Sequence, residues 1–577
     1  MTEASSPTRT DAGVEQQLAL PSVPRRTVLA GGALVGAAAL VVSPFDDDEA
    51  RAALAGASPY FRHGVASGDP LANRVVLWTR VTPTPDATPG SGRGPAVTVE
   101  YQVATDTRFR QLVTRGTVRT DAAADHTVKV DAWGMQPGRW YYYRFLHRGV
   151  ASPVGRTKTA PAYTSAPARL RMGVVSCANL QAGYFHAYRH LAARNDLDAI
   201  LHLGDYLYEY APGQYGMGQD DVDVRRHVPA REMVSLADYR QRHGQYKEDP
   251  DLQWLHSKYP FVVTWDDHES TNDAWRDGAE NHQPGEGDWA TRRSRAHRAY
   301  DEWMPVRLGS TAALGDGTRL FRSLRFGTLA ELSMLDLRTY RDQQVAYPVV
   351  DPAVSDPART ITGREQLAWL KKAVASTAVQ WKLVGNPVMI APVTFAQLPT
   401  DLIDPVNDVT GLLPRDGAPY NVDQWDGYTD DRRELFTHIR DQGIRDTVFV
   451  TGDIHSGWAA DLPYDVATYP LGRSAGVEFV ASSVTSNNLK DILGAPPRTA
   501  SLAVETVIRT ANRHVRYLDF DSHGYSVLDV TPARAQMDWY TTGPRDQRNA
   551  GSTWAASFQT LAGTNKLSRA AGPVGGN

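Results

Sequence analysis

The chain has 577 residues, with 61 Lys and Arg against 65 Asp and Glu, and hydrophobic residues make up 42% of it. This balance is that of an ordinary soluble globular protein and excludes wholesale disorder. The net charge of −4 leaves no basic excess over the whole chain, so stable nucleic-acid binding is not expected. The single cysteine excludes an intramolecular disulfide and a zinc site made of several thiolates.

Residues 1–57 are predicted to be a Tat signal peptide with its flanking segment. The pair Arg25-Arg26 is followed at once by an uncharged, Gly- and Ala-rich run at 27–44, and small residues follow near Ala55. This order is typical of an export signal, and the twin arginines favour the Tat machinery. We therefore expect a secreted or cell-wall-associated protein with no membrane span when mature. A single membrane anchor is the alternative, although the run is short and weakly apolar for one.

Residues 58–160 are predicted to form a small all-β sandwich domain. Apolar and polar residues alternate with period two in four segments, at 75–81, 97–106, 126–133 and 139–149, and turn-forming sequences separate the segments. No helical pattern interrupts them, which favours a β-sandwich.

Residues 161–577 are predicted to form the catalytic domain, of α/β class. Apolar strands and amphipathic helical segments alternate, which indicates layers of sheet and helix. The predicted strands lie within 171–179, 199–210, 261–270, 329–341, 381–390 and 446–458, and two of the helices lie within 362–376 and 430–443. The Gly-, Ala- and Ser-rich tail after Ser552 is only weakly patterned.

Potential metal ligands directly follow five of these strands. They are Cys177, then Asp205, then Asp266, Asp267 and His268, then Asn386, and finally Asp453 and His455. Ligands of α/β sheets lie beyond the carboxyl ends of the strands, so these side chains are expected to meet at one edge. One acid at a strand end is more often a turn former, but five such strands together predict a polynuclear metal centre.

The same segments carry a resemblance to a known family. In order and separation, the sequences at 204–210, 264–273, 336–342, 385–389 and 451–458 resemble those of the PhoD-like alkaline phosphatases and phosphodiesterases. Segment 63–81 is similar to the N-terminal domain of the family, and the resemblance covers nearly the whole exported chain. It implies a layered metallophosphatase-like β-sandwich with flanking helices, preceded by the small all-β domain.

The resemblance also implies a ligand set. Iron(III) would be held by Cys177, Asp205, Tyr208 and His455. Calcium would share Asp205 and use Asp267 and Asn386, with Asp453 as a weaker candidate. Thiolate and phenolate donors suit a trivalent iron, whereas acid and amide oxygens suit calcium. Two zinc ions would be expected to use more imidazoles.

The implied activity is that of an exported, metal-dependent phosphoesterase that hydrolyses phosphomonoesters, phosphodiesters or both by attack of a metal-activated hydroxide on phosphorus. His268 is expected to protonate the leaving group or to contact a phosphate oxygen. Arg338 and Arg341 either pair with phosphate oxygens or form salt bridges, with Asp336 and Asp342 or with the long loops. The alternative function is a secreted, non-catalytic protein that binds a wall polymer or carbohydrate on a metallophosphatase scaffold.

Overall fold

The structure is a computed structural model that describes residues 58–216, 223–307, 319–346, 351–395 and 416–575. The predicted signal peptide, with Arg25 and Arg26, lies outside the described residues. Within the described residues, none of the helices combines the length and the apolar character that a membrane span requires.

A ten-stranded sheet carries the first three predicted site segments. Its strand order is β24-β23-β22-β21-β9-β10-β11-β1-β2-β5. The central strands β9 (Leu170–Val175), β10 (Ala199–Leu203) and β11 (Pro260–Thr264) are parallel and buried along their whole length, as parallel strands covered on both faces are expected to be. The other strands are β1 (Val65–Gly68), β2 (Arg74–Arg80), β5 (Thr127–Trp133), β21 (Gly524–Val530), β22 (Arg534–Thr542), β23 (Ser552–Leu561) and β24 (Leu567–Arg569).

A seven-stranded sheet carries the remaining site segments. Its order is β12-β13-β14-β17-β19-β18-β20, and β13, β14, β17 and β19 are parallel neighbours. Its strands are β12 (Arg322–Phe326), β13 (Ala330–Met334), β14 (Trp381–Asn386), β17 (Thr447–Thr451), β18 (Gly457–Pro463), β19 (Ser474–Val480) and β20 (Val515–Asp519). A separate short pair is formed by β15 (Thr394–Phe395) and β16 (Ala418–Pro419).

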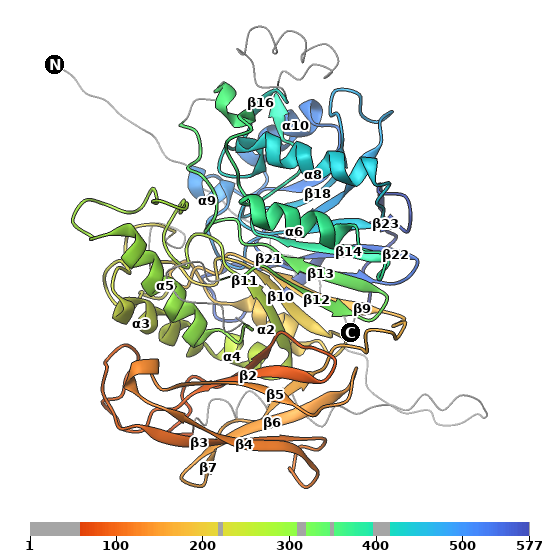
Figure 1. The fold of residues 1–577 in the computed structure, drawn as a ribbon. Helices are drawn as coiled ribbons and strands as arrows, with labels where there is room; N and C mark the ends of the chain where they lie inside the picture. Colours follow the sequence, from red (N-terminus) through yellow and green to blue (C-terminus); the bar gives the residue numbers. More distant parts are fainter. Residues whose placement is uncertain (1–57, 217–222, 308–318, 347–350, 396–415, 576–577) are drawn as a thin grey trace, which may run out of the picture. The chain divides into compact units, whose positions relative to one another are not determined.

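The two large sheets pack face to face, and helices cover their outer faces (Figure 1). Leu201 and Val262 of one sheet meet Leu383 and Val450 of the other in a single buried cluster. Helices α2 (His186–Ala193), α3 (Leu236–Lys247), α4 (Pro250–Lys258) and α5 (Trp289–Trp303) cover the ten-stranded sheet. Helices α6 (Arg364–Val374), α8 (Thr429–Asp441) and α10 (Ala500–Ala511) cover the seven-stranded sheet, and the short α9 (Leu489–Leu493) precedes α10. This arrangement confirms the predicted layered α/β class.

The N-terminal segment forms a second β-sandwich that shares strands with the catalytic sheet. A five-stranded sheet contains β4, β3, β6 and β7 in that order, with β8 paired to β6. It packs on β1, β2 and β5, and β1 continues the ten-stranded sheet by pairing in parallel with β11. The domain boundaries at 57 and 160 stay predictions. The strands are β3 (Val97–Ala104), β4 (Leu112–Thr120), β6 (Trp140–His147), β7 (Val150–Ala151) and β8 (Gly155–Lys158).

The tail after Ser552 is more regular than its sequence pattern indicates. Strand β23 pairs along its length with β22 and then with β24. Because β22 is a largely buried strand that offers its backbone donors and acceptors to a neighbour, even a weakly alternating segment can form a strand beside it.

Candidate metal centre

Four of the predicted ligands follow parallel strands in an unusual backbone conformation. Cys177 follows β9, Asp205 follows β10, and Asp453 and His455 follow β17; their φ angles are 59°, 53°, 66° and 52°. Few residues other than glycine adopt this left-handed region, and each such residue costs roughly 1–3 kcal/mol unless its surroundings hold it there. Such strain concentrates at functional sites, and here it turns the four side chains toward one another.

Asp205 is the residue on which three groups of potential metal ligands converge. The groups are Cys177, Asp205 and His455; Asp205, Asp267 and His268; and Asp205, Asp266 and Asp453. Within each group the ligand atoms lie within 4.8 Å of one another. All three groups therefore share one carboxylate, which has the two oxygens needed to contact two cations.

The environment of Asp205 fits a cation. Its Oδ1 atom is buried and has no hydrogen-bond partner among the described residues, whereas buried polar atoms are normally paired. Burial raises the pKa of the Asp205 carboxyl well above its usual range; His268 opposes this rise, and the Asp267 and Asp266 carboxylates add to it. Positive charge bound among these oxygens would remove both the desolvation cost and the repulsion.

The four residues expected to hold iron are brought together. The Tyr208 hydroxyl donates to Asp205 Oδ2 at 2.9 Å, lies 3.2 Å from His455 Nε2 and accepts a hydrogen bond from Ser486 Oγ at 2.6 Å. His455 Nδ1 lies 2.7 Å from the carbonyl oxygen of Asn487, so Nδ1–H donates there and Nε2 faces Tyr208. A thiol, a phenol, an imidazole and a carboxylate thus share one small volume.

Glu209 orients His268, a contact that sequence reasoning missed. His268 Nδ1 lies 2.8 Å from Glu209 Oε2, and the other carboxylate oxygen of Glu209 accepts from the Asn272 backbone and the Asn281 side chain. Although burial opposes it, the His268 charge and these hydrogen bonds lower the pKa of Glu209 to about 2. The His268 ring also lies against that of Tyr208, with centroids 4.0 Å apart. The sequence offered one indication of this role: Glu209 directly follows Tyr208 in the segment 204–210, which contains two predicted ligands.

Arg338 and Arg341 form ion pairs, and the partner they share is Asp423, in the loop after β16, as the loop alternative allowed. Arg338 contacts both oxygens of Asp266, at 2.5 and 3.1 Å, and both oxygens of Asp423, each at 2.9 Å. Arg341 contacts Asp423 at 2.7 Å and donates to the carbonyl oxygen of Ala274. Both guanidinium groups are buried. In the described residues, Asp336 and Asp342 form an ion pair with neither arginine: Asp342 pairs with Arg276, and Asp336 accepts from the Trp265 indole and from backbone N–H groups.

Asn386 is the last residue of β14, and its side-chain amide is already hydrogen-bonded within the protein. Its Nδ2 donates to the Val388 carbonyl and to Thr451 Oγ1, and its Oδ1 accepts from the Trp425 indole at 3.1 Å. An amide oxygen has two lone pairs, so Oδ1 keeps one acceptor position. Its neighbour Glu478 accepts from the backbone of the loop after β14, at residues 390 and 391, which gives it a structural role there.

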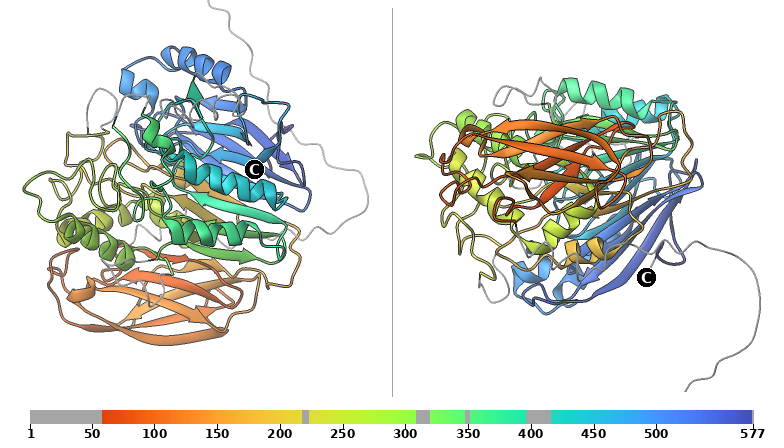
Figure 2. Two further views of the ribbon diagram at one scale, coloured as in Figure 1. Left: turned by 45° about the horizontal axis from the view of Figure 1, so that its top comes forward. Right: turned by 90° about the horizontal axis from the view of Figure 1, so that it is seen from below.

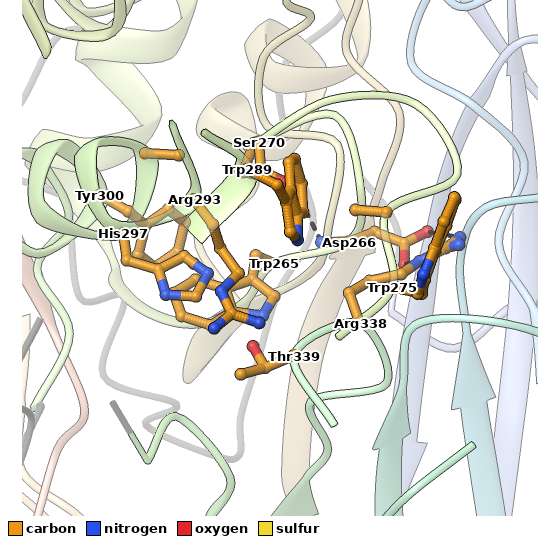
Figure 3. A pocket seen from close by; sticks show the side chains of 13 residues that line it. Trp265, Asp266, Ser270, Trp275, Trp289, Arg293, His297, Tyr300, Arg338 and Thr339 are labelled. Atoms are coloured by element: carbon orange, nitrogen blue, oxygen red, sulfur yellow. Dashed lines mark hydrogen bonds and ion pairs between the residues drawn. The ribbon is translucent and has the colours of Figure 1, made fainter. Parts of the chain in front are cut away.

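A small cavity with aromatic walls lies beside Asp266 and Arg338 (Figure 3). Its other walls include Trp265, Trp275, Trp289, His297 and Tyr300. The Trp265 ring stacks on His297, with centroids 4.2 Å apart, and its indole N–H donates to Asp336. The cavity has room for about one water molecule. Its walls therefore support the Arg338–Asp266 pair and do not form a substrate-sized pocket.

Comparisons with known proteins identify the family to which the chain belongs. A family model described as PhoD-like phosphatase matches residues 172–539, and the model of the family's N-terminal domain matches residues 48–161. The chain is 36% identical over 501 residues to alkaline phosphatase D of Bacillus subtilis (strain 168), covering 86% of this chain and 80% of that protein. A solved structure of PhoD superposes with a TM-score of 0.79 at 34% identity, covering 90% of this chain and 93% of that chain.

Asp205→Asn is expected to remove bound metal and nearly all turnover. The substitution is nearly isosteric but takes away the charge that all three ligand groups share, so activity should fall by more than about a hundredfold while the fold persists. Metal content by mass spectrometry, turnover and the thermal midpoint are measured together. Asp277→Asn, at a carboxylate that is 71% exposed, is the matched control. Full metal content and full turnover in Asp205→Asn would mean that the shared-carboxylate model is wrong.

Glu209→Gln is expected to lower kcat by about 10- to 100-fold, because the neutral amide no longer holds His268 Nδ1–H with a full charge. KM for a small aryl phosphate should change little, since Glu209 faces His268 and does not face the solvent. Glu280→Gln is the control, because Glu280 is exposed and accepts from the Asn272 side chain, away from His268. Equal kcat values for the two variants would contradict the positioning role.

Proposed function

Because the chain belongs to the PhoD-like phosphatase family, we propose that it is an exported, metal-dependent phosphoesterase whose reaction is centred on Asp205. The observation that carries the proposal is the buried Asp205 carboxylate, which belongs to three ligand groups and has one oxygen without a hydrogen-bond partner in the described part of the chain. The non-catalytic alternative is not carried forward, since the family is one of phosphatases.

We assign the ligands by donor chemistry. Cys177, Tyr208, His455 and one oxygen of Asp205 would hold iron(III), since thiolate and phenolate donors stabilise a trivalent ion. Asp267, Asn386 and the other oxygen of Asp205 would hold calcium, which prefers oxygen donors. Asp453 lies within the ligand group of Asp205 and Asp266 and is the weaker calcium candidate. Asp266 is the less available of that pair, because Arg338 occupies both its oxygens.

Side chains of the protein would transfer the proton and offset the negative charge of the site. When bound, the cations would supply Lewis-acid polarisation of the phosphoryl group and stabilise the charge that develops on it. His268 is held by Glu209 through Nδ1, which leaves Nε2 to carry a proton to the leaving-group oxygen or to donate to a phosphate oxygen. Arg338 lies 3.8 Å from Asp267 and 3.9 Å from Asp453, so its charge offsets part of the repulsion among the acids. Asp423, which also pairs with Arg341, holds Arg338 in place.

We propose that the substrates are phosphomonoesters, phosphodiesters or both. The metal-dependent hydrolysis of aryl phosphates and aryl phosphodiesters, measured side by side with a carboxyl ester, tests this assignment. Hydrolysis of the carboxyl ester alone would contradict it.

Tyr208→Phe is expected to abolish or shift a broad visible absorption band. The band would arise from charge transfer between the phenolate and iron(III), and the phenylalanine ring lacks the oxygen. The absorption spectrum is recorded before and after treatment with a calcium chelator, which should lower activity without removing the colour. A colourless wild-type enzyme that is fully active with zinc alone would contradict the iron assignment.

We also propose Tat export, on the evidence of Arg25-Arg26 and the apolar run that follows. Replacing the pair by Lys-Lys should retain the protein in the cell, because the export receptor distinguishes the guanidinium pair from two ammonium groups. Fractionation with immunodetection measures the exported share. Unchanged export of the Lys-Lys variant would exclude the Tat route.

A further inference from the structure

The five-stranded N-terminal sheet buries one face and leaves the other open. Val97, Val99 and Val103 of β3 pack in the core, whereas Thr98, Glu100 and Gln102, which alternate with them, point the other way. Residues directly opposite in antiparallel strands share a face. This outer face lies on the near side in Figure 2, right, where strands β3 and β4 are red to orange.

The strand register places arginines on this outer face. Thr98 pairs with Arg119, and Gln102 lies between Arg115 on β4 and Arg144 on β6. Arg115 and Arg119 are exposed, and their separation of four strand residues corresponds to about 13 Å. Arg144 donates to Gln102 and lies over the ring of Phe109. The same face carries one acid, Glu100, which lies opposite Thr117 and accepts a hydrogen bond from Gln102 at 2.8 Å, so the three arginines exceed the acids by two. We call the residues Thr98, Glu100, Gln102, Arg115, Thr117, Arg119 and Arg144 the outer face.

The charge around the outer face is opposite to that of the whole chain. Segments 97–120 and 139–158 contain nine Lys and Arg against two Asp and Glu, a net charge of +7 in a chain of net charge −4. Within the described residues, Arg115, Arg119 and Arg144 form no ion pair, and neither do Arg108, Arg110 and Arg148 in the adjoining turns. Exceptions lie at the β8 edge, where Lys158 pairs with Asp198 and Arg156 donates to the Lys258 carbonyl. A concentrated, unpaired positive field costs self-repulsion, and a polyanion relieves it.

We propose that the outer face docks a linear polymer whose repeats carry phosphate. Arginine forks match phosphate oxygens in bidentate geometry, and Thr and Gln side chains between them supply further hydrogen-bond donors. The inference rests on the proposed function, for which such a polymer would be a substrate held close to the enzyme. A membrane surface fits less well, because the exposed residues of β3, β4 and β6 are polar or charged apart from Leu112, and so offer little apolar surface to insert.

The test compares two charge-matched double variants. Arg115→Gln with Arg119→Gln removes two charges from the outer face, and Arg509→Gln with Arg513→Gln removes two exposed charges from α10 and the loop after it. Long-chain polyphosphate is the probe, and binding is followed by fluorescence anisotropy at low salt with inorganic phosphate present to saturate the metal centre. The outer-face variant should bind about tenfold more weakly and with a smaller salt dependence, whereas the control should bind as the wild type does. Arg115→Glu with Arg119→Glu should weaken binding further.

Hydrolysis separates this inference from the proposed function. All variants should hydrolyse a small aryl phosphate at the wild-type rate, since the outer face has no part in the metal centre. Equal polyphosphate affinity in the outer-face and control variants would overturn the docking surface, even if aryl phosphate is hydrolysed. Tighter binding of anionic vesicles than of polyphosphate would overturn the choice of a polymer. Absence of any phosphoester hydrolysis in the wild type would instead refute the function, and the anisotropy would still decide the docking.

Discussion

The repulsion among crowded carboxylates is the constraint on which the structure of the site depends. Asp205, Asp266 and Asp267 are buried, and Asp453 lies half-buried beside them. Burial and mutual repulsion raise the pKa of Asp205 and Asp453 well above their usual range, against the opposing charges of His268 and Arg338. Arg338 neutralises part of the negative charge and is itself fastened by Asp423. A folded chain tolerates such a cluster of carboxylates when bound cations neutralise their charge. The whole set of donors, and not any single residue, therefore indicates a metal centre.

The fold brings the donors together by placing the carboxyl ends of two parallel sheet cores at one edge. Strands β9, β10 and β11 deliver Cys177, Asp205 and the Asp266–His268 segment, and β14 and β17 deliver Asn386 and the Asp453–His455 segment. The chain must turn sharply after these strands to do so. Gly204, with a φ of 106°, shows how little room there is: a Cβ there would lie 2.5 Å from the Asp266 Cβ. The left-handed backbone of the ligand residues is the cost of this close approach.

Much of this arrangement is predictable from the sequence because it is encoded locally. An apolar strand that ends in a ligand-type residue is visible in a single segment, which makes Cys177, Asp205, Asp267 and His455 recognisable as candidates, and the resemblance of segment 204–210 to the family adds Tyr208. The layered α/β class follows from the alternation of strands and helices. The assignment of iron and calcium, by contrast, stays a proposal, because donor types restrict the choice of metal and do not determine it.

The features that sequence patterns do not predict depend on partners far apart in the chain. Asp423 pairs with Arg338 across 85 residues, and no local pattern marks that contact. Likewise, period-two alternation predicts strands in the N-terminal segment but not their neighbours, so it gives no sign of the parallel pairing of β1 with β11. Strand β23 depends in the same way on the edge offered by β22. Glu209 is the intermediate case, adjacent to a predicted ligand but recognisable only through its contact with His268.

The most direct test of the shared-carboxylate centre is anomalous X-ray diffraction from crystals of the metal-loaded enzyme, collected on both sides of the iron absorption edge. The account predicts an iron peak among Cys177 Sγ, Tyr208 Oη and His455 Nε2, and a second cation without an iron signal, with one oxygen of Asp205 bound to each. A single cation that does not touch Asp205, or two peaks with the zinc edge and none with the iron edge, would contradict it.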